Sequence, residues 1–221
     1  MSQEFSSVRG GGIVSAPSAR PETVEADAIV TFLTEGGVGA GAIATVDAAA
    51  DGVIARLASA GEITGKRFEC VPILAPPRLR AGQLVVAGLG RREDVDAGVL
   101  YRAAATAARQ LAGRPRARVA FVADDRWTPR ELEQAVAGAA VGMVGQDLHR
   151  SEKKRTRFGT TLWLGAAADV VDRGTIIAEG VNLARRLVNM PPDELYPQTF
   201  AEEAAAVAGR TGMEIEIWDE D

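Results

Sequence analysis

Very few side chains in this sequence could carry out chemistry. It contains one cysteine, Cys70, and one histidine, His149. A structural zinc site needs about four ligands, so one cysteine and one histidine cannot build it. A hydrolase that uses a histidine base would depend on His149, which lies beside the charged stretch 150–157. We therefore predict that His149 is an ordinary surface residue and that Cys70 and His149 build neither a catalytic nor a metal site.

A glycine-rich segment offers a second chemical possibility. Gly37-Val38-Gly39-Ala40-Gly41-Ala42 lies between an apolar run and a helical pattern, where a dinucleotide-binding loop would hold a pyrophosphate. Glu35 stands directly before these glycines, and its charge would repel phosphate. No acidic residue closes a second strand at the spacing that recognises ribose. We therefore interpret the segment as a turn.

The third possibility is a basic run that could meet nucleic acid. Its cationic residues are Arg150, Lys153, Lys154, Arg155 and Arg157. No aromatic side chain is interleaved with them, and the net charge of the chain is −5. An acidic protein is a poor match for a polyanion. We predict a solvated loop and consider nucleic acid an unlikely partner.

The apolar pattern indicates how these residues would be positioned. Short apolar runs predict strands at residues 12–15, 28–33, 68–74, 84–87, 118–123, 160–164 and 213–218. Helical spacing predicts helices at residues 43–57, 99–111, 129–144, 173–188 and 197–208, the third with Thr128 as its N-cap. Because strands and helices alternate, we expect an α/β sandwich whose sheet is mixed or largely parallel.

This alternation pauses at Ala166-Ala167-Ala168-Asp169, which we take as a domain boundary. Residues 1–168 would form the first domain. Residues 169–221 are too few to bury a core of their own. They would contain a helix, the Pro191-Pro192 elbow and the first elements of a truncated second domain. The helix before the elbow has an apolar stripe at helical spacing, formed by Ile177, Val181, Ala184 and Val188.

The segment from Gly180 to Pro197, GVNLARRLVNMPPDELYP, resembles the joint between the two domains of leucyl aminopeptidases, the M17-type family with two metals. Upstream segments resemble that family's N-terminal domain in the same order and at similar spacing. They are Ala26-Asp27-Ala28-Ile29-Val30, Gly65-Lys66, Leu84-Val85-Val86-Ala87-Gly88-Leu89-Gly90 and the charged stretch from His149 to Lys154. The resemblance covers most of the chain.

The resemblance implies a macro-domain-like three-layer fold for residues 1–168, followed by an interdomain helix. It also implies a parent metalloaminopeptidase that removes N-terminal amino acids from peptides. Such enzymes hold two divalent metals, Mn or Zn, with Asp, Glu and Lys of a catalytic domain, and they form homo-oligomers, here a hexamer. None of those ligands can be placed on this sequence, which has no lysine after Lys154. We expect this chain alone to be inactive, with the catalytic domain of the same protein as its partner.

The sequence departs from the family pattern at two positions of the joint. Arg186 stands where an acidic residue is usual, which puts any ion pair there in doubt. Tyr196 stands where threonine is commoner, and tyrosine is a poorer N-cap, at a cost of ~1 kcal/mol.

Two other functions remain open. Asp27-Ala28-Ile29-Val30 also resembles macro domains, so the chain could be a stand-alone module that binds ADP-ribose or another nucleotide-like ligand. The following residues, Thr31 to Thr34, lack the asparagine that macro domains place there. A DNA-binding accessory domain is the remaining alternative, suggested by the basic run.

The sequence also carries expectations about location. No apolar run approaches the ~20 residues that cross a bilayer, so we expect no membrane association. The first residues lack a basic segment followed by an apolar one, which is the pattern of a secretory signal. A single cysteine forms no intrachain disulfide and fits a reducing compartment. We expect a cytoplasmic protein.

Overall fold

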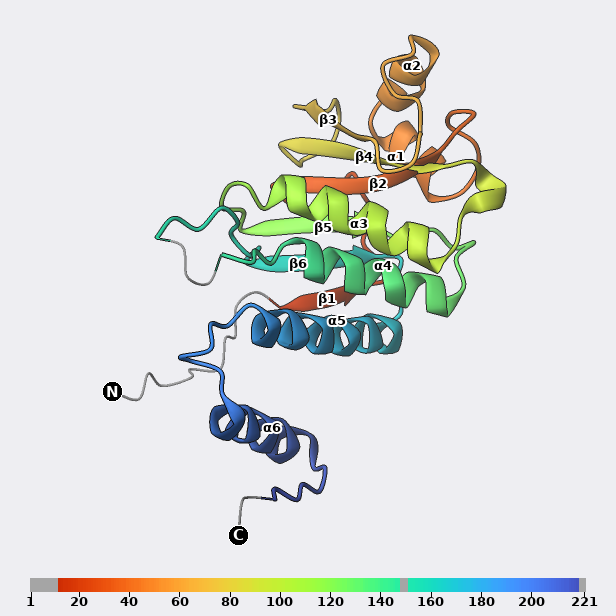
Figure 1. Ribbon diagram of the computed structural model, residues 1–221. Helices are drawn as coiled ribbons and strands as arrows, with labels where there is room; N and C mark the ends of the chain where they lie inside the picture. Colours follow the sequence, from red (N-terminus) through yellow and green to blue (C-terminus); the bar gives the residue numbers. More distant parts are fainter. Residues whose placement is uncertain (1–11, 148–150, 219–221) are drawn as a thin grey trace.

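The computed structural model describes residues 12–147 and 151–218, which form a six-stranded sheet with helices on both faces and a C-terminal extension (Figure 1). The strands are β1 (Ile13–Ala16), β2 (Ala28–Thr34), β3 (Cys70–Leu74), β4 (Gln83–Gly90), β5 (Arg118–Val122) and β6 (Thr160–Leu164). The helices are α1 (Ala42–Ala49), α2 (Val53–Ser59), α3 (Ala97–Leu111), α4 (Pro129–Gly142), α5 (Ala168–Val188) and α6 (Pro197–Thr211), with a 3-10 turn at Arg92–Asp94.

The strands run in the order β1-β6-β5-β2-β4-β3, and every neighbouring pair is parallel except β3 with β4. The predicted α/β fold with a mixed, largely parallel sheet is confirmed. The central strands β2 and β4 are buried along almost their whole length, which explains their continuous apolar runs. Alternate side chains of β2 enter two separate hydrophobic clusters: Val30 and Phe32 on one face, Ile29 and Leu33 on the other.

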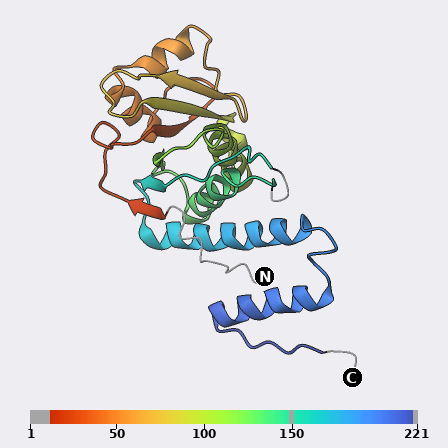
Figure 2. The same ribbon diagram turned by 90° about the vertical axis from the view of Figure 1, so that its left-hand side faces the viewer.

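The two faces carry different helices (Figures 1 and 2). Helices α3 and α4 cover one face, together with the first part of α5, while α1 and α2 lie over the other. Helices α3 and α4 approach each other very closely. A Cβ atom added at Gly138 would overlap the carbonyl oxygen of Tyr101, and one added at Gly142 would overlap that of Ala105. The alanine-rich composition of both helices allows this close approach.

The predicted helix over residues 43–57 is wrong as a single element, because it is two helices. The chain turns at Asp51 and Gly52, which both have positive φ. The Asp47 carboxylate accepts hydrogen bonds from the backbone N–H groups of Ile54 (2.8 Å) and Ala55 (3.1 Å), so it caps the first turn of α2. Apolar spacing that continues through a break cannot reveal the break.

Helix α5 begins at Ala168, earlier than predicted, and packs its first half against α4 and β1. Gly174 and Ala178 are buried there, and a Cβ atom at Gly174 would meet Val136 at 2.7 Å. The predicted apolar stripe is correct for its first two members, since Ile177 and Val181 pack on the core. It is wrong for Ala184 and Val188, which are exposed. After Val181, about the last two turns of α5 no longer pack on the hydrophobic core.

Two of the sequence segments that carry the family resemblance meet at one place in the fold. The backbone around Gly65 packs tightly against β4. The Gly65 carbonyl accepts a hydrogen bond from the Gly90 N–H (2.8 Å), and the Gly88 carbonyl accepts one from the Phe68 N–H (2.8 Å). A Cβ atom at Gly88 would overlap the Lys66 carbonyl. These glycines are required because backbone packs directly on backbone. Their role at this point is structural.

Candidate functional site

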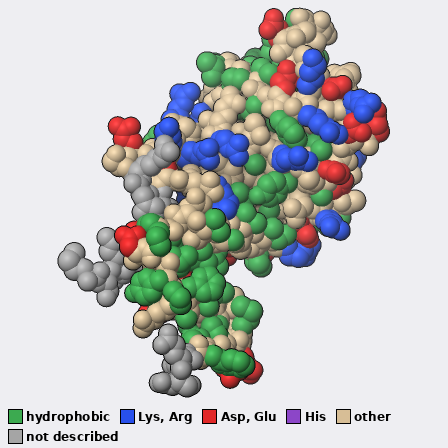
Figure 3. Space-filling view, in the orientation of Figure 1, with side chains coloured by type: hydrophobic (Ala, Val, Ile, Leu, Met, Phe, Trp, Pro, Cys, Tyr) green, Lys and Arg blue, Asp and Glu red, His purple; other side chains and the backbone are tan. Residues whose placement is uncertain are grey.

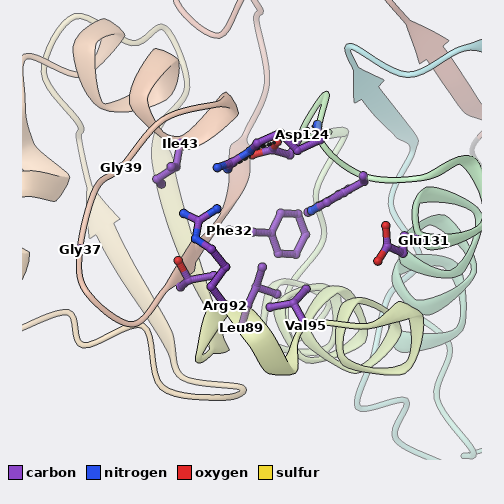
Figure 4. Close-up of a pocket in the computed structure, with 12 residues that line it drawn as sticks. Phe32, Gly37, Gly39, Ile43, Leu89, Arg92, Val95, Asp124 and Glu131 are labelled. Carbon is purple, nitrogen blue, oxygen red and sulfur yellow. Dashed lines mark hydrogen bonds and ion pairs between the residues drawn. The ribbon is translucent and has the colours of Figure 1, made fainter.

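One cleft lies at the carboxyl ends of β2, β4 and β5, the edge at which open α/β sheets usually bind ligands. Its volume is about 170 Å³. Phe32 and Trp127 form one wall, with ring centroids 5.1 Å apart in an edge-to-face arrangement. Figure 4 shows Asp124, Arg92 and Glu131 around the opening, with the glycine-rich turn at Gly37 and Gly39 on the opposite side.

The carboxylate of Asp124 is buried in this cleft, and hydrogen bonds from neighbouring groups stabilise its negative charge. Arg126 donates from Nε (2.7 Å) and from a terminal nitrogen (2.6 Å) to the two carboxylate oxygens. The backbone N–H of Ala42, at the start of α1, also donates to Asp124 (3.3 Å). Burial works against ionisation, but these hydrogen bonds outweigh it and hold the pKa of Asp124 below its ordinary value. The remaining acid, Glu131, caps α4 with Thr128.

The groups in this cleft can be compared with those that a bound nucleotide-like ligand would need. A phosphate would be held by the N–H groups at the start of α1, but the Asp124 carboxylate already lies there. The Arg126 guanidinium covers Gly41, where an added Cβ atom would stand 2.6 Å from it. The predicted turn at residues 36–41 is confirmed. Nothing in this cleft supports the binding of ADP-ribose.

Other candidates named from the sequence are inert or structural. Burial raises the pKa of the Cys70 thiol to about 11, so it is protonated at neutral pH and a poor nucleophile. His149 and Arg150 lie outside the described residues. Lys153 donates to the Asp147 carbonyl (2.6 Å), and the Lys154 N–H donates to the Asp147 carboxylate (2.6 Å). This part of the basic run therefore folds back on its own loop.

An ion pair links α5 to α6 at the joint. Arg186 donates two hydrogen bonds, of 2.8 and 2.7 Å, to the two carboxylate oxygens of Glu203. The hydrogen bonds of Arg186 hold the pKa of Glu203 below its ordinary value, although burial opposes this. The doubt about an ion pair at Arg186 is resolved, since the basic residue on α5 finds its acidic partner on α6.

The start of α6 also has a cap. Tyr196 is the N-cap residue, and its side chain makes no capping hydrogen bond. The hydroxyl of Thr199 accepts a hydrogen bond from the Tyr196 N–H (3.0 Å) and donates to the Glu194 carbonyl (2.9 Å). Thr199 therefore satisfies the N–H of the N-cap residue, which is the role of the N3 side chain in a capping box. The elbow at 189–196 has a defined exit direction because of these contacts.

An apolar groove of about 330 Å³ lies between α5, α6 and the residues that follow α6. Leu183 and Leu187 of α5 form one side, and Phe200, Ala204 and Val207 of α6 form the other. The lining residues are Leu183, Leu187, Phe200, Glu203, Ala204, Val207, Ala208, Met213, Glu214 and Ile215. Figure 3 shows hydrophobic side chains gathered over this lower part of the molecule, in contrast to the charged surface of the body.

The predicted strand at residues 213–218 is wrong in the described chain. The segment has no strand neighbour and no regular secondary structure. Its large side chains face solvent: Trp218 is 84% exposed, Met213 58% and Ile217 54%. Alternating apolar residues create the potential for a strand, but a strand forms only where another strand offers hydrogen bonds.

No group of three or more His, Cys, Asp or Glu side chains among residues 12–147 and 151–218 is placed to hold a metal ion. Within the same residues, no helix is long and apolar enough to cross a membrane.

Sequence comparison places this geometry in a class of proteins. The profile of the "Cytosol aminopeptidase family, N-terminal domain" matches residues 29–157, which is more than half of the chain. The chain therefore belongs to the cytosol aminopeptidase family, by its N-terminal domain, as the sequence resemblance predicted.

Two relatives are described as probable cytosol aminopeptidases. The protein of Rhodopirellula baltica is 33% identical over 162 residues, covering 73% of this chain and 32% of the relative. The protein of Corynebacterium diphtheriae is 34% identical over 206 residues, covering 90% of this chain and 40% of the relative. The chain thus spans well under half the length of these relatives.

Solved structures share the fold. A tomato leucine aminopeptidase mutant superimposes with a TM-score of 0.74 at 19% identity, covering 91% of this chain and 43% of that protein. The bottromycin maturation enzyme BotP, solved in complex with Mn, gives a TM-score of 0.64 at 21% identity, covering 84% of this chain and 37% of that protein.

Sequence reasoning missed the cleft residues Asp124 and Arg126, although an acidic residue directly after a buried strand was the signal for them.

Proposed function

We propose that this chain is the non-catalytic N-terminal domain of a metal-dependent leucyl aminopeptidase, and that the apolar groove and the 213–218 segment dock on that enzyme's catalytic domain. The observation that carries the proposal is the apolar surface that α6 and the following residues leave uncovered. A contiguous exposed apolar surface marks an interface. The relatives that match this chain extend well beyond the matched part, which supports a catalytic domain as the occupant.

The order of the segments favours the same occupant. The groove and the 213–218 segment follow the body along the chain, on the side of the matched region from which a following domain would continue. Met213, Ile215 and Ile217 alternate with Glu214 and Glu216, a pattern that suits a strand buried on one face. In the whole enzyme this segment would pair with a strand of the catalytic domain, and the groove would close over an apolar partner.

The chemistry of the enzyme would come from outside this chain. Its catalytic domain would hold two divalent metals, Mn or Zn, and remove N-terminal amino acids from peptides in the cytoplasm. The enzyme would assemble as a homo-oligomer, a hexamer in this family. We propose the same division of the chain, with residues 1–168 as the body and residues 169–221 carrying the joint. The packed first half of α5 adds to the body's core.

An activity assay tests the catalytic half of this proposal. The purified 221-residue chain is incubated with leucine p-nitroanilide and Mn²⁺ or Zn²⁺, beside a leucine aminopeptidase as positive control. We expect no metal-dependent release of p-nitroaniline, because no group of three or more His, Cys, Asp or Glu side chains among the described residues is placed to hold a metal ion. Turnover that depends on metal and survives repeated purification would overturn the proposal.

The docking half is tested on a longer product of the same gene. We expect the reading frame after the codon for Asp221 to encode a motif rich in Lys and Asp that binds metals. In that longer protein, the amides of residues 213–218 should exchange with solvent at least ~10-fold more slowly than in the 221-residue chain, because strand pairing protects them. Equal exchange in the two proteins would exclude docking by this segment.

A further inference from the structure

A second hollow, of about 500 Å³, lies where the C-terminal half of α5 meets the loop after α4 and the end of α6. Its lining is dominated by cations and by side-chain amides. The lining residues are Val144, Gly145, Gln146, Arg157, Glu179, Asn182, Leu183, Arg185, Arg186, Asn189 and Arg210. Four arginines therefore face a single carboxylate, Glu179. The apolar groove lies on another part of the same joint.

Only one of these arginines is paired directly with a carboxylate, although Arg210 lies close enough to Glu203 to help lower the pKa of that carboxyl. Arg186 is paired with Glu203. No carboxylate among the described residues forms an ion pair with Arg157, Arg185 or Arg210. Arg157 and Arg210 are exposed and come from different segments, so they can move toward a ligand from two sides.

Arg185 is the half-buried member of the group. It donates to the carbonyls of Val141 (3.2 Å) and Val144 (3.4 Å) and to the Asn182 side-chain oxygen (2.9 Å). The carbonyls at the end of α4 offset part of its charge. These three bonds leave two of its five N–H donors without an acceptor among the described residues.

The environment of Arg185 also shows an excess of positive charge. Burial lowers the pKa of Arg185, Tyr101 opposes this effect, and the nearby Arg155 and Arg109 each lower the pKa further. Arg155 donates to the same Val144 carbonyl (3.4 Å), so two guanidinium groups converge on one acceptor. A bound anion would relieve this repulsion, because it favours the charged form of every arginine around it.

We propose that this hollow is a binding site for a polyvalent oxyanion, a small molecule with at least two phosphate or carboxylate groups. Guanidinium forks recognise both groups through paired N–H donors. Arg157, Arg185 and Arg210 come from three separate segments and supply the charge. The amides of Asn182, Asn189 and Gln146 supply neutral donors. Occupation would tie the loop after α4 to both helices of the joint and so stiffen the joint.

Titration calorimetry on the 221-residue chain tests this site, with pyrophosphate and citrate as the two probes and sodium chloride at equal ionic strength as the blank. We expect saturable binding with a stoichiometry of one for at least one probe, weakened by added salt. The double variant Arg157→Ala/Arg210→Ala should bind at least ~10-fold more weakly, since it removes two charge-assisted contacts. Pyrophosphate without citrate would assign the site to phosphates, and the reverse to carboxylates.

The matched control is Arg20→Ala/Arg130→Ala. It removes the same two charges from exposed side chains that do not line the hollow. It should bind the probes as the parent chain does. Failure of both probes to bind saturably, or equal weakening by the two double variants, would overturn the proposal. The aminopeptidase assignment would stand in either case, because this measurement involves no turnover.

Discussion

The body of the molecule and its C-terminal arm, residues 189–218, are built in opposite ways. In the body, α3 and α4 pack so closely that glycine is required at two crossing points, Gly138 and Gly142. The central strands expose almost nothing. In the arm, Ala208 is the one buried residue of α6, and large side chains such as Phe200 and Trp218 face solvent.

We predict from this difference that the body folds unaided and the arm does not. Burial of apolar area is worth about 25 cal/mol per Å², against an ordering cost of ~1–2 kcal/mol per residue. The body gathers its apolar side chains in two buried clusters. Helix α6 presents mainly alanine and buries little. The arm is therefore ordered by its cap and its ion pair, and it lacks the partner that its apolar face requires.

The largest expected effect is a contrast in hydrogen exchange between the two regions. Core amides of β5 should exchange through global unfolding, which costs ~5–15 kcal/mol in a domain of this size. Amides of residues 213–218 should exchange almost as fast as in an unfolded chain, because they have no strand partner. Exchange followed by mass spectrometry on a dilute monomer measures both. Protection of 213–218 equal to that of β5 would show that the arm belongs to the body's core.

The next effect tests how tightly the body is packed. Gly138→Ala should destabilise the protein by ~1–3 kcal/mol, because its Cβ atom would overlap the Tyr101 carbonyl and force α3 and α4 apart. Gly180→Ala is the matched control in α5, where an added Cβ atom meets nothing within 4 Å. That change should stabilise the chain by ~0.5–1 kcal/mol through helix propensity. Urea unfolding of both variants measures the difference, and a loss of the same size in both would refute the close-packing argument.

Much of the body was predictable from its sequence, for a physical reason. Strands buried on both faces give unbroken apolar runs, as in residues 84–87, and capping residues such as Thr128 mark helix starts directly. The break at Asp51-Gly52 was not predictable from apolar spacing, since Ile43 to Leu57 keep a helical pattern through it. The cap that Asp47 provides for α2 depends on a fold-back that spacing does not encode.

The functional surfaces were less predictable because they are made by distant segments. The groove needs Leu183 and Leu187 to face α6, which depends on the angle of the elbow. The sequence indicated the stripe through Ala184 and Val188 instead, since it treated α5 as a helix with one partner. The arginine hollow joins residues 157, 185 and 210, and no local pattern brings these together. The segment 213–218 is the opposite case. Its local sequence has the alternation of a strand, but no strand forms because no neighbouring strand offers hydrogen bonds.

The smallest expected effect concerns the ion pair that joins the arm to α5. Arg186 and Glu203 are mostly buried, at 29% and 18% side-chain exposure, and their contact is bidentate. A double-mutant cycle with Arg186→Ala, Glu203→Ala and the double variant should give a coupling of ~1 kcal/mol. The measured quantity is the protection factor of the α6 amides. Substitution in the joint should leave the unfolding midpoint of the body almost unchanged, which separates the two regions.

Acid should break the same pair. The hydrogen bonds of Arg186 hold the pKa of Glu203 in the folded chain below the ordinary value of a glutamate. A carboxyl group with a lowered folded pKa stabilises the structure above its unfolded pKa, and the stabilisation disappears as pH falls through the folded value. Protection of α6 should therefore be constant from pH 7 to about 5 and fall at pH values below about 4.5. Glu203→Gln, which cannot titrate, should show weaker protection at pH 7 and no such acid step in α6. An acid step of equal size in that variant would place the titrating group in the body, where Asp124 also has a lowered pKa. The Arg186–Glu203 ion pair would then not be what holds the arm against α5.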